Sequence, residues 1–398
     1  VGIIDAIEID EDAYEKMEKL NLVRGGDKIR KTIGLILSFV IISMLLYWIL
    51  KKYCRNIMES KAFYPTLITI SIINVMYIVF RNEFLIYLLP FAMIPIILTI
   101  LGNKIYALTF SFLNMIILSR EETWFLVTIA VAIMAIYKAE KMTSRSDIVK
   151  LGISTGVFQG IMALSYGLVN QLEFPLLLGM IVLSVLSGIL TGMISLALLP
   201  YFENSFEILT DIKLLELSDF SNALLKQLLV TAPGTFHHSI MVGALAESGA
   251  EAIGVNAIFA RVASYYHDIG KMKRPEFFVE NQRDGKNIHN TIKPSLSALI
   301  ITSHTKDGYI MGKQNKLPKE ILDIILCHHG TTLVQFFYYK SLEKGEYVLE
   351  NDFRYSGPKP KSKEAGIIML ADTIEAAVRV SEDKSREGIE NLIRYLIK

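Results

Sequence analysis

Charged side chains are missing from long stretches of the first half of this sequence. Seven apolar segments between residues 32 and 200 contain no Asp, Glu, Lys, Arg or His. They are residues 32–50, 64–80, 84–102, 105–119, 123–137, 151–170 and 175–200. Together with an overall hydrophobic content of 52%, these segments exclude an ordinary water-soluble protein. Pumps and ion-coupled transporters usually need charges at membrane depth, so the same absence argues against transport.

The sequence also has few cysteines and a net charge close to zero. The two cysteines are Cys54, in a short polar loop, and Cys327, next to His328, so we expect no disulfide between them and a reducing environment for both. Cys327 could be a soft metal ligand, but a small core-facing helix residue is the better interpretation. A formal net charge of +1 gives no global attraction for DNA or RNA polymers. Any anionic ligand must therefore be held by local chemistry.

The order of these features predicts an all-α protein with four parts. Residues 1–31, which carry many charges of both signs and begin without Met, are interpreted as the tail of a missing extracellular domain. Residues 32–200 are predicted to form a seven-helix transmembrane bundle, although the fourth and fifth segments, with 15 residues each, are shorter than the ~20 residues that span a bilayer. Residues 201–230 are predicted as a connecting helix, and residues 231–398 as a cytosolic all-helical domain.

The loops between the segments predict the orientation. With seven spans and the C-terminal domain inside, the inner loops carry nine Lys and Arg residues and the outer loops only two, Arg81 and Arg120. Basic residues accumulate on the cytoplasmic side of short loops. We therefore expect a multi-pass protein of a bacterial-type cell membrane, with its N-terminus outside and its C-terminal domain in the cytoplasm. Glycines spaced by four in the last two segments favour helix packing within one bundle, and a homodimer is the alternative.

All seven histidines of the chain lie between His237 and His329. Five of them, with two aspartates, form an ordered set of candidate metal ligands: His238, His267, Asp268, His304, His328, His329 and Asp372. Imidazole and carboxylate suit iron, manganese, zinc or cobalt, and seven ligands are too many for one ion. Two divalent ions about 3.5 to 4 Å apart could clamp and polarise a phosphodiester, which predicts metal-assisted phosphoester hydrolysis. The rival interpretation is a set of unrelated surface or helix-end residues.

Three further motifs accompany the ligands and carry a resemblance. They are residues 232–239 (APGTFHHS), 328–332 (HHGTT) and 352–360 (DFRYSGPKP). With the ligand order, they resemble the HD-domain phosphohydrolase superfamily, and with seven preceding spans they resemble the seven-transmembrane HD proteins of the PgpH type, which are cyclic di-AMP phosphodiesterases. The match covers about residues 30–398, and the large extracellular domain of that family is absent from this sequence. The Gly-Tyr-Pro signature of the cyclic di-GMP branch is also absent, because Gly330 is followed by Thr331 and Thr332.

The resemblance implies a role for each ligand. All seven residues would hold two divalent metal ions, manganese or iron, with His267 and Asp268 as catalytic residues. Asp268 would bridge the ions, because it follows His267 and lies centrally in the ligand order. One ion would be held by His238, His267, Asp268 and Asp372, and the other by Asp268, His304, His328 and His329. His237 and His289 fall outside this set and are expected to have supporting or surface roles.

Substrate contacts are predicted from five other residues. They are Lys271, Thr331, Thr332, Arg354 and Lys359. Lys and Arg can form charge-assisted hydrogen bonds with phosphoryl oxygens, whereas the rival interpretation of the basic residues is simple solvation.

The leading hypothesis is thus a phosphodiesterase in the lipid bilayer that converts cyclic di-AMP to linear pApA. Two alternatives stay open. One keeps the site and changes the substrate to cyclic di-GMP or another nucleotide. The other is a receptor that binds a nucleotide without turnover, although such a receptor would normally have lost a ligand.

Overall fold

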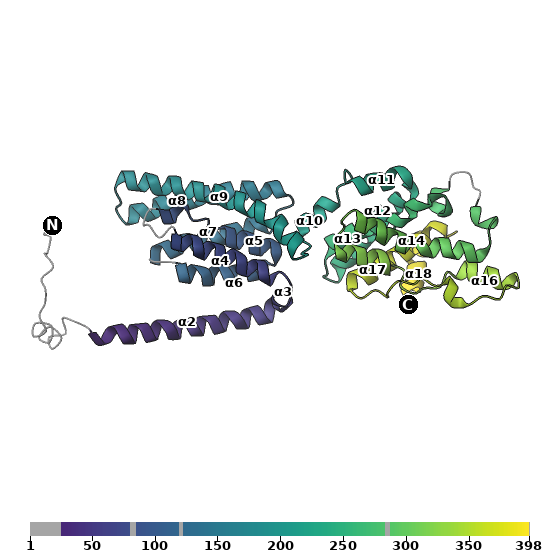
Figure 1. The fold of residues 1–398 in the computed structure, drawn as a ribbon, viewed down its shortest axis with the longest axis horizontal. Helices are drawn as coiled ribbons and strands as arrows, with labels where there is room; N and C mark the ends of the chain where they lie inside the picture. The colour runs from purple at the N-terminus through teal and green to yellow at the C-terminus, as the bar shows by residue number, and fades with distance from the viewer. Residues whose placement is uncertain (1–24, 80–84, 119–121, 283–286, 398) are drawn as a thin grey trace, which may run out of the picture. The chain divides into compact units, whose positions relative to one another are not determined.

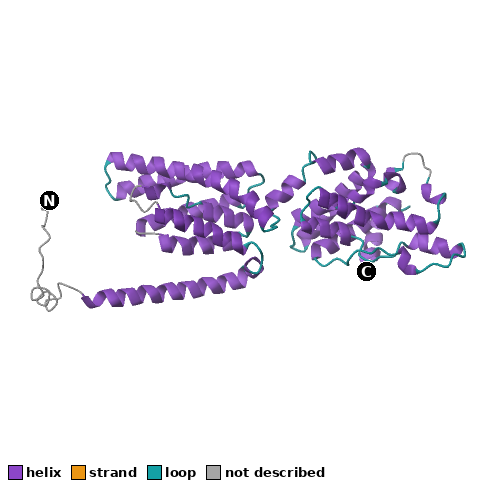
Figure 2. Ribbon diagram, viewed as in Figure 1, coloured by secondary structure: helices purple, strands orange, loops and turns teal. Residues whose placement is uncertain are grey.

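A computed structural model describes residues 25–79, 85–118, 122–282 and 287–397. These residues form helices joined by short loops and contain no strand, and Leu333 and Arg354 form an isolated bridge (Figure 2). The all-α prediction is therefore confirmed. Most of the predicted extracellular tail lies outside the described residues. The chain divides into two compact units, Val1–Glu140 with Ser154–Thr191 and Lys141–Ile153 with Gly192–Lys398.

The N-terminal half is a series of apolar helices (Figure 1). They are α2 (Gly25–Tyr53), α3 (Arg55–Met58), α4 (Phe63–Val79), η1 (Leu85–Leu88), α5 (Met93–Leu101), α6 (Lys104–Leu118), α7 (Glu122–Ala139), α8 (Arg145–Val169) and α9 (Phe174–Ser205). Within the described part of the chain, α8 and α9 are long and apolar enough to cross a membrane, and four other apolar helical stretches are shorter. The count of seven spans stays a prediction.

The third apolar segment is not one continuous helix. It breaks at Pro90, between η1 and α5. Proline has no backbone N–H and disfavours helical geometry at the residue before it, here Leu89. The Leu89 carbonyl at the break accepts hydrogen bonds from the Ser187 hydroxyl at 2.5 Å and from the Phe91 amide at 2.8 Å. The backbone carbonyl at the break is thus hydrogen-bonded within the same unit.

The spaced glycines of the last two segments meet within one chain. A Cβ atom on Gly156 would lie 2.7 Å from the carbonyl oxygen of Val185 and 2.9 Å from the Cα of Gly188. The backbones of α8 and α9 therefore pass in contact at this point, which supports packing within one bundle.

The C-terminal half contains the candidate ligands. Its helices are α10 (Asp211–Leu217), α11 (Ala223–Thr231), α12 (Pro233–Ala252), α13 (Ala257–Tyr266), η2 (Ile269–Lys273), η3 (Pro275–Phe277), η4 (Val279–Asn281), η5 (Ile288–Asn290), α14 (Pro294–Gln314), α15 (Lys319–Cys327), α16 (Gln335–Glu343), η6 (Glu350–Phe353), α17 (Lys363–Val380) and α18 (Arg386–Ile397).

The stretch predicted as one connecting helix differs from that prediction. It contains the end of α9 and two short helices, α10 and α11. Glu207 has a positive φ of 52°, which ends the preceding helix, and Thr210 caps α10 by accepting a hydrogen bond from the Lys213 amide at 3.2 Å. Asn222 caps α11 in the same way, through the Leu224 amide. A new helix therefore begins after each of these two caps.

The core of the C-terminal half connects these short helices to the site. Leu214, Leu217 and Leu225 are buried in one apolar cluster with residues of α12, α13, α15 and α17. The Tyr266 hydroxyl, also buried, donates a hydrogen bond to the Leu217 carbonyl at 2.6 Å. Because Tyr266 directly precedes His267, this core fixes the backbone from which the central ligands project.

Candidate metal centre

Helix ends place the central ligands. Asn256 caps α13 by accepting from the Phe259 amide at 2.8 Å, and the helix ends at Tyr266. His267 and Asp268 follow at this end, and both side chains are fully buried or nearly so. His328 stands in the same position at the end of α15. Side chains at a helix end can turn inward without interrupting the helix, which explains why paired ligands occur there.

Gly270 lets a second helix approach Asp268. A Cβ atom at this position would lie 1.9 Å from the His304 carbonyl oxygen and 2.5 Å from the Gly308 amide nitrogen. Gly270 lies in η2, just after the end of α13. The absence of a side chain at Gly270 allows the backbone of α14 to approach. His304 lies in the middle of α14, and this close contact between backbones brings its side chain beside Asp268.

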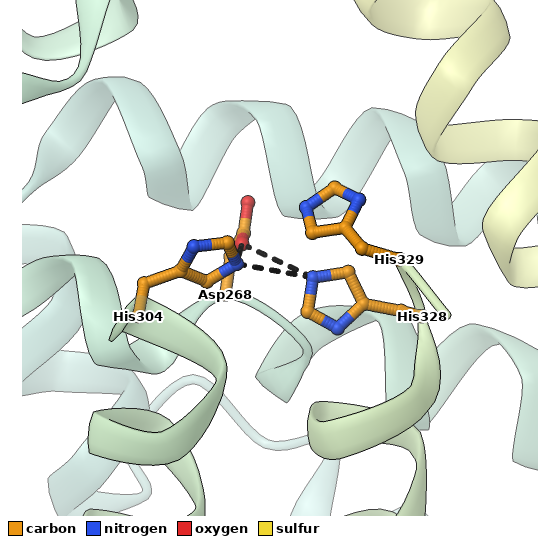
Figure 3. A group of neighbouring side chains, drawn as sticks. All are labelled: Asp268, His304, His328 and His329. Carbon is orange, nitrogen blue, oxygen red and sulfur yellow. Dashed lines mark hydrogen bonds and ion pairs between the residues drawn. The ribbon is translucent and has the colours of Figure 1, made fainter. Parts of the chain in front are cut away.

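Asp268 lies between two groups of histidines. Its Oδ1 atom is 3.2 Å from His304 Nε2 and 3.6 Å from His328 Nε2 (Figure 3). Its Oδ2 atom is 3.5 Å from His238 Nε2 and 3.2 Å from His267 Nε2. Each carboxylate oxygen therefore faces a different pair of imidazoles.

The second carboxylate completes one side of this arrangement. Asp372 Oδ1 lies 2.9 Å from His238 Nε2 and 3.8 Å from His267 Nε2. Its other oxygen lies 3.6 Å from His329 Nδ1. Three overlapping groups have ligand atoms within 4.8 Å of one another: Asp268 with His304, His328 and His329; His238, His267 and Asp268; and His267, His328 and Asp372. The structure thus brings all seven predicted ligands together.

The outer ring nitrogens of three histidines are held by backbone carbonyls. His267 Nδ1 contacts the Ser264 carbonyl at 2.7 Å, His304 Nδ1 that of Ile301 at 2.6 Å, and His328 Nδ1 that of Ile325 at 2.9 Å. A carbonyl only accepts, so each Nδ1 carries the proton and each Nε2 presents a lone pair to the centre.

The inward-facing atoms lack hydrogen-bond partners. His267 Nε2 and Asp268 Oδ1 are buried and make no hydrogen bond, while Asp268 Oδ2 has only the Lys271 ammonium group as a partner, at 2.7 Å. His304 Nε2 and His328 Nε2 lie 3.2 Å apart although both present lone pairs. Buried polar atoms without partners are costly, and divalent cations between them would satisfy them all. The donor set therefore fits a divalent metal centre.

His329 is oriented by a different contact. Its ring stacks on that of Tyr355, with centroids 4.3 Å apart and planes 32° apart. Tyr355 is buried, and burial raises the pKa of its hydroxyl. His329 is the most exposed histidine of the set, with 24% of its side chain accessible. Tyr355 therefore holds the least buried histidine against the cluster.

Charge on Asp268 is preserved despite its burial. Burial favours the neutral acid, but the neighbouring positive charge of Lys271 helps to hold the pKa of Asp268 well below its usual range. Lys271 Nζ forms ion pairs with Asp268 Oδ2 at 2.7 Å and with Glu280 Oε1 at 2.9 Å. Burial opposes the charge on Lys271, but Asp268 and Glu280 raise its pKa. The centre therefore attracts cations.

The predicted substrate residues lie in different surroundings. Lys271 is buried and paired as described above. Arg354 is ion-paired with Glu350 and donates to the Thr331 carbonyl at 2.9 Å. Thr332 is exposed, and its hydroxyl donates to the His329 carbonyl at 2.8 Å. Lys359 is exposed, with its backbone beside Gly330. Arg354 and the two threonines thus border the loop that follows His329, and their contact with substrate stays a prediction.

The two remaining histidines lie apart from the ligands. His237 is exposed on α12. His289 is buried, and its Nε2 contacts the Phe277 carbonyl at 2.7 Å, while its ring lies 5.0 Å from that of Phe337. His289, in η5, therefore contacts both η3, through Phe277, and α16, through Phe337.

Sequence reasoning missed three supporting residues. Glu375 contacts His238, Glu280 contacts Lys271, and Tyr355 stacks on His329. Glu375 could have been found, because it follows Asp372 by three residues in a predicted helix and so shares its face. Tyr355 and Glu280 lie in segments without a clear period, and no local pattern indicates where their side chains point.

Comparison with known families agrees with this geometry. Residues 29–210 match the model described as "7TM receptor with intracellular HD hydrolase", and residues 235–377 match the HD domain. The candidate ligands all fall within the second match. The class defined by the helices and the ligand set is therefore that of the HD-domain proteins.

Curated relatives narrow the family. The chain is 36% identical over 411 residues to the cyclic-di-AMP phosphodiesterase PgpH of Bacillus subtilis, and 34% identical over 408 residues to that of Listeria monocytogenes. These matches cover 98% of this chain and 57% and 56% of the relatives, so the chain spans little more than half of their length. The chain belongs to the family of seven-transmembrane HD proteins of the PgpH type.

A solved structure is also similar. It is the HD domain of L. monocytogenes phosphodiesterase PgpH in complex with cyclic-di-AMP, at 49% sequence identity. The match covers 45% of this chain and 84% of that chain, with a TM-score of 0.44.

Proposed function

We propose that this chain is a membrane-anchored phosphodiesterase that uses two divalent metal ions to hydrolyse cyclic di-AMP to linear pApA. The observation that carries the proposal is the position of Asp268. Each of its two oxygens faces a separate pair of imidazole nitrogens, as a carboxylate that bridges two ions requires.

Each group of residues would have a separate role in hydrolysis. Two bound ions would polarise the phosphodiester and lower the pKa of water near it. His238, His267 and Asp372 would hold the ion on one side of Asp268, and His304, His328 and His329 the ion on the other. Asp268 keeps its negative charge and offsets part of the positive charge of both ions. The carbonyl contacts of His267, His304 and His328 keep these rings turned inward before substrate arrives, so little reorganisation is needed.

Lys271 would tune Asp268 from the side away from the histidines of α14 and α15. Its ammonium group lies 2.7 Å from Oδ2, the oxygen that faces His238 and His267. A cation at this distance competes with a metal ion for the same oxygen, and Glu280 gives the ammonium group a second partner. We expect Lys271 to move toward Glu280 or toward a phosphoryl oxygen of the substrate when an ion binds.

The choice of substrate rests on the curated relatives. The two proteins named above are called cyclic-di-AMP phosphodiesterases, and they match nearly the whole of this chain. The residues after the paired histidines, Gly330-Thr331-Thr332, also differ from the cyclic di-GMP signature. Arg354, Lys359 and the two threonines are proposed to contact the substrate beside His329.

The ligand chemistry and the N-terminal half support the remaining parts of the proposal. A nitrogen- and oxygen-rich set without thiolate suits manganese or iron. Residues 32–200 are proposed to cross the lipid bilayer seven times, and residues 231–398 to lie in the cytoplasm, because basic residues gather in the loops on that side. A homodimer is proposed as a state to be tested by mass measurement in detergent.

The proposed function is tested by product analysis. The purified chain in detergent is incubated with cyclic di-AMP, cyclic di-GMP or a nucleoside monophosphate in the presence of Mn²⁺, and products are separated by chromatography. We expect pApA from cyclic di-AMP at a rate at least tenfold above the others. Faster hydrolysis of cyclic di-GMP would change the substrate, and tight binding of cyclic di-AMP without product would favour a receptor.

A further inference from the structure

His238 differs from the other histidines whose Nε2 atoms face the centre. The Nδ1 atoms of those three rings contact backbone carbonyls of their own helices, which no substitution can remove. His238 Nδ1 instead contacts two side chains, Glu375 Oε2 at 2.5 Å and a guanidinium nitrogen of Arg379 at 2.8 Å. The position of the proton on the His238 ring therefore depends on two side chains, which substitutions can change.

The three shortest side-chain contacts of His238 come from a single helix. Asp372, Glu375 and Arg379 follow one another by three and four residues on α17 and so share one face. Asp372 lies 2.9 Å from Nε2 of the ring, and Glu375 lies 2.5 Å from Nδ1. The imidazole of His238, which is 3% exposed, is thus held between two carboxylates of α17.

The two neighbours of Nδ1 require opposite tautomers. A carboxylate accepts a hydrogen bond, so Glu375 requires the proton on Nδ1. The Nε2 atom, 2.9 Å from Asp372, then needs no proton of its own when an ion takes the place of the proton between these two ligands. A guanidinium group only donates, so a bond from Arg379 to Nδ1 requires the proton on Nε2, where it would block an ion. Arg379 is also ion-paired with Glu375. The carboxylate therefore both selects the binding tautomer and occupies the group that would oppose it.

We infer that Glu375 is a positioning residue that fixes the tautomer of His238 and thereby sets the affinity of the metal site formed by His238, His267, Asp268 and Asp372. This inference rests on the two-ion centre of the proposed function and not on the identity of the phosphodiester. Glu375 contacts none of the side chains of the other site, which shares only Asp268 with this one, so the affinity of the other site should change much less. Carboxylate partners of ligand histidines typically contribute about 10- to 100-fold in metal affinity.

The test is a titration of the full-length chain in detergent. The chain is stripped with a chelator and titrated with Mn²⁺, and the affinities of the two sites are measured by calorimetry. We expect Glu375→Ala to weaken one site by about 10- to 100-fold and to change the other much less. Glu375→Gln should lose less, because its amide oxygen still accepts from Nδ1.

A double variant separates tautomer control from simple packing. In Glu375→Ala, Arg379 is the remaining partner of Nδ1 and favours the blocking tautomer. We expect removal of the guanidinium group in Glu375→Ala/Arg379→Ala to restore part of the lost affinity. A purely structural role predicts the reverse, since each truncation would add to the damage.

The chain offers a matched control. Glu390 and Arg394 on α18 form an ion pair with the same spacing, at 2.8 Å, and are exposed. Glu390→Ala should leave both affinities unchanged. Two ions bound by Glu375→Ala with normal affinities, or a double variant weaker than the single one, would overturn the role of Glu375. Fewer than two ions bound by the wild-type chain would instead overturn the two-ion centre itself.

Discussion

Replacement of Asp268 by asparagine removes one negative charge and keeps the size of the side chain. Both oxygens of Asp268 are buried, and each lies 3.2 to 3.6 Å from two imidazole nitrogens. In Asp268→Asn, one of the two oxygen positions becomes an NH₂ group, which cannot bind a cation. One side of the proposed centre therefore loses a ligand, and the other side keeps only a neutral carbonyl.

The size of the effect follows from the charge. Two unit charges 4 Å apart interact by about 4 kcal/mol at an effective dielectric constant of about 20, and a dication doubles this value. Desolvation of the ion offsets part of it, so we take about 4 kcal/mol as the net loss. Since each 1.36 kcal/mol is about tenfold, we expect Mn²⁺ affinity and turnover to fall by about a thousandfold.

Metal content and rate are measured on the same purified sample. Circular dichroism should show unchanged helix content, because the apolar core around Tyr266 is not altered. Asp323→Asn is the control, since it makes the same chemical change at an exposed position on α15. Two tightly bound ions per chain with near-normal turnover in Asp268→Asn would refute the bridging role.

Three further substitutions test neighbouring parts of the site. Gly270→Ala places a methyl group 1.9 Å from the His304 carbonyl, so we expect a loss of about 1 to 3 kcal/mol in unfolding free energy and a large loss of activity. Gly366→Ala, where no atom lies within 4 Å, should be neutral or stabilising in the same melting experiment, and equal melting of both variants would contradict the close contact. Tyr355→Leu removes the ring stacked on His329 and should weaken Mn²⁺ binding at the His329 site about tenfold, while Tyr355→Phe should not. An equal loss in both variants would show that the hydroxyl, rather than the ring, matters. Arg354→Ala should raise KM for cyclic di-AMP several-fold with little change in kcat, and an unchanged KM would remove Arg354 from the substrate site.

Much of the site could be predicted because its signals are local. Asn256, His267 and Asp268 lie within 13 residues, and the cap and helix end that position them follow from residue type. The clustering of all histidines between His237 and His329 indicated that distant helices converge. Sequence order, together with the resemblance to HD domains, therefore predicted the candidate ligands that the structure brings together.

Other features depend on packing between distant segments. The α14 helix continues through His304 to Gln314. Its Gly308 and Gly312 admit side chains of α15, with Ile325 and Leu322 at 2.9 and 2.7 Å from the added Cβ positions. This packing outweighs the low helix propensity of glycine. The pairing of Lys271 with Glu280 could not be predicted for the same reason, since Glu280 lies in the single turn η4, which has no sequence period.

The central claim is that two metal ions around Asp268 support hydrolysis of cyclic di-AMP. The most direct measurement titrates Mn²⁺ into chelator-stripped, full-length chain and follows bound metal per chain together with the rate of pApA formation. We expect no turnover in the stripped chain and a rate that rises as the second ion binds. Full activity in the metal-free chain, or maximal activity with one ion bound, would contradict the account.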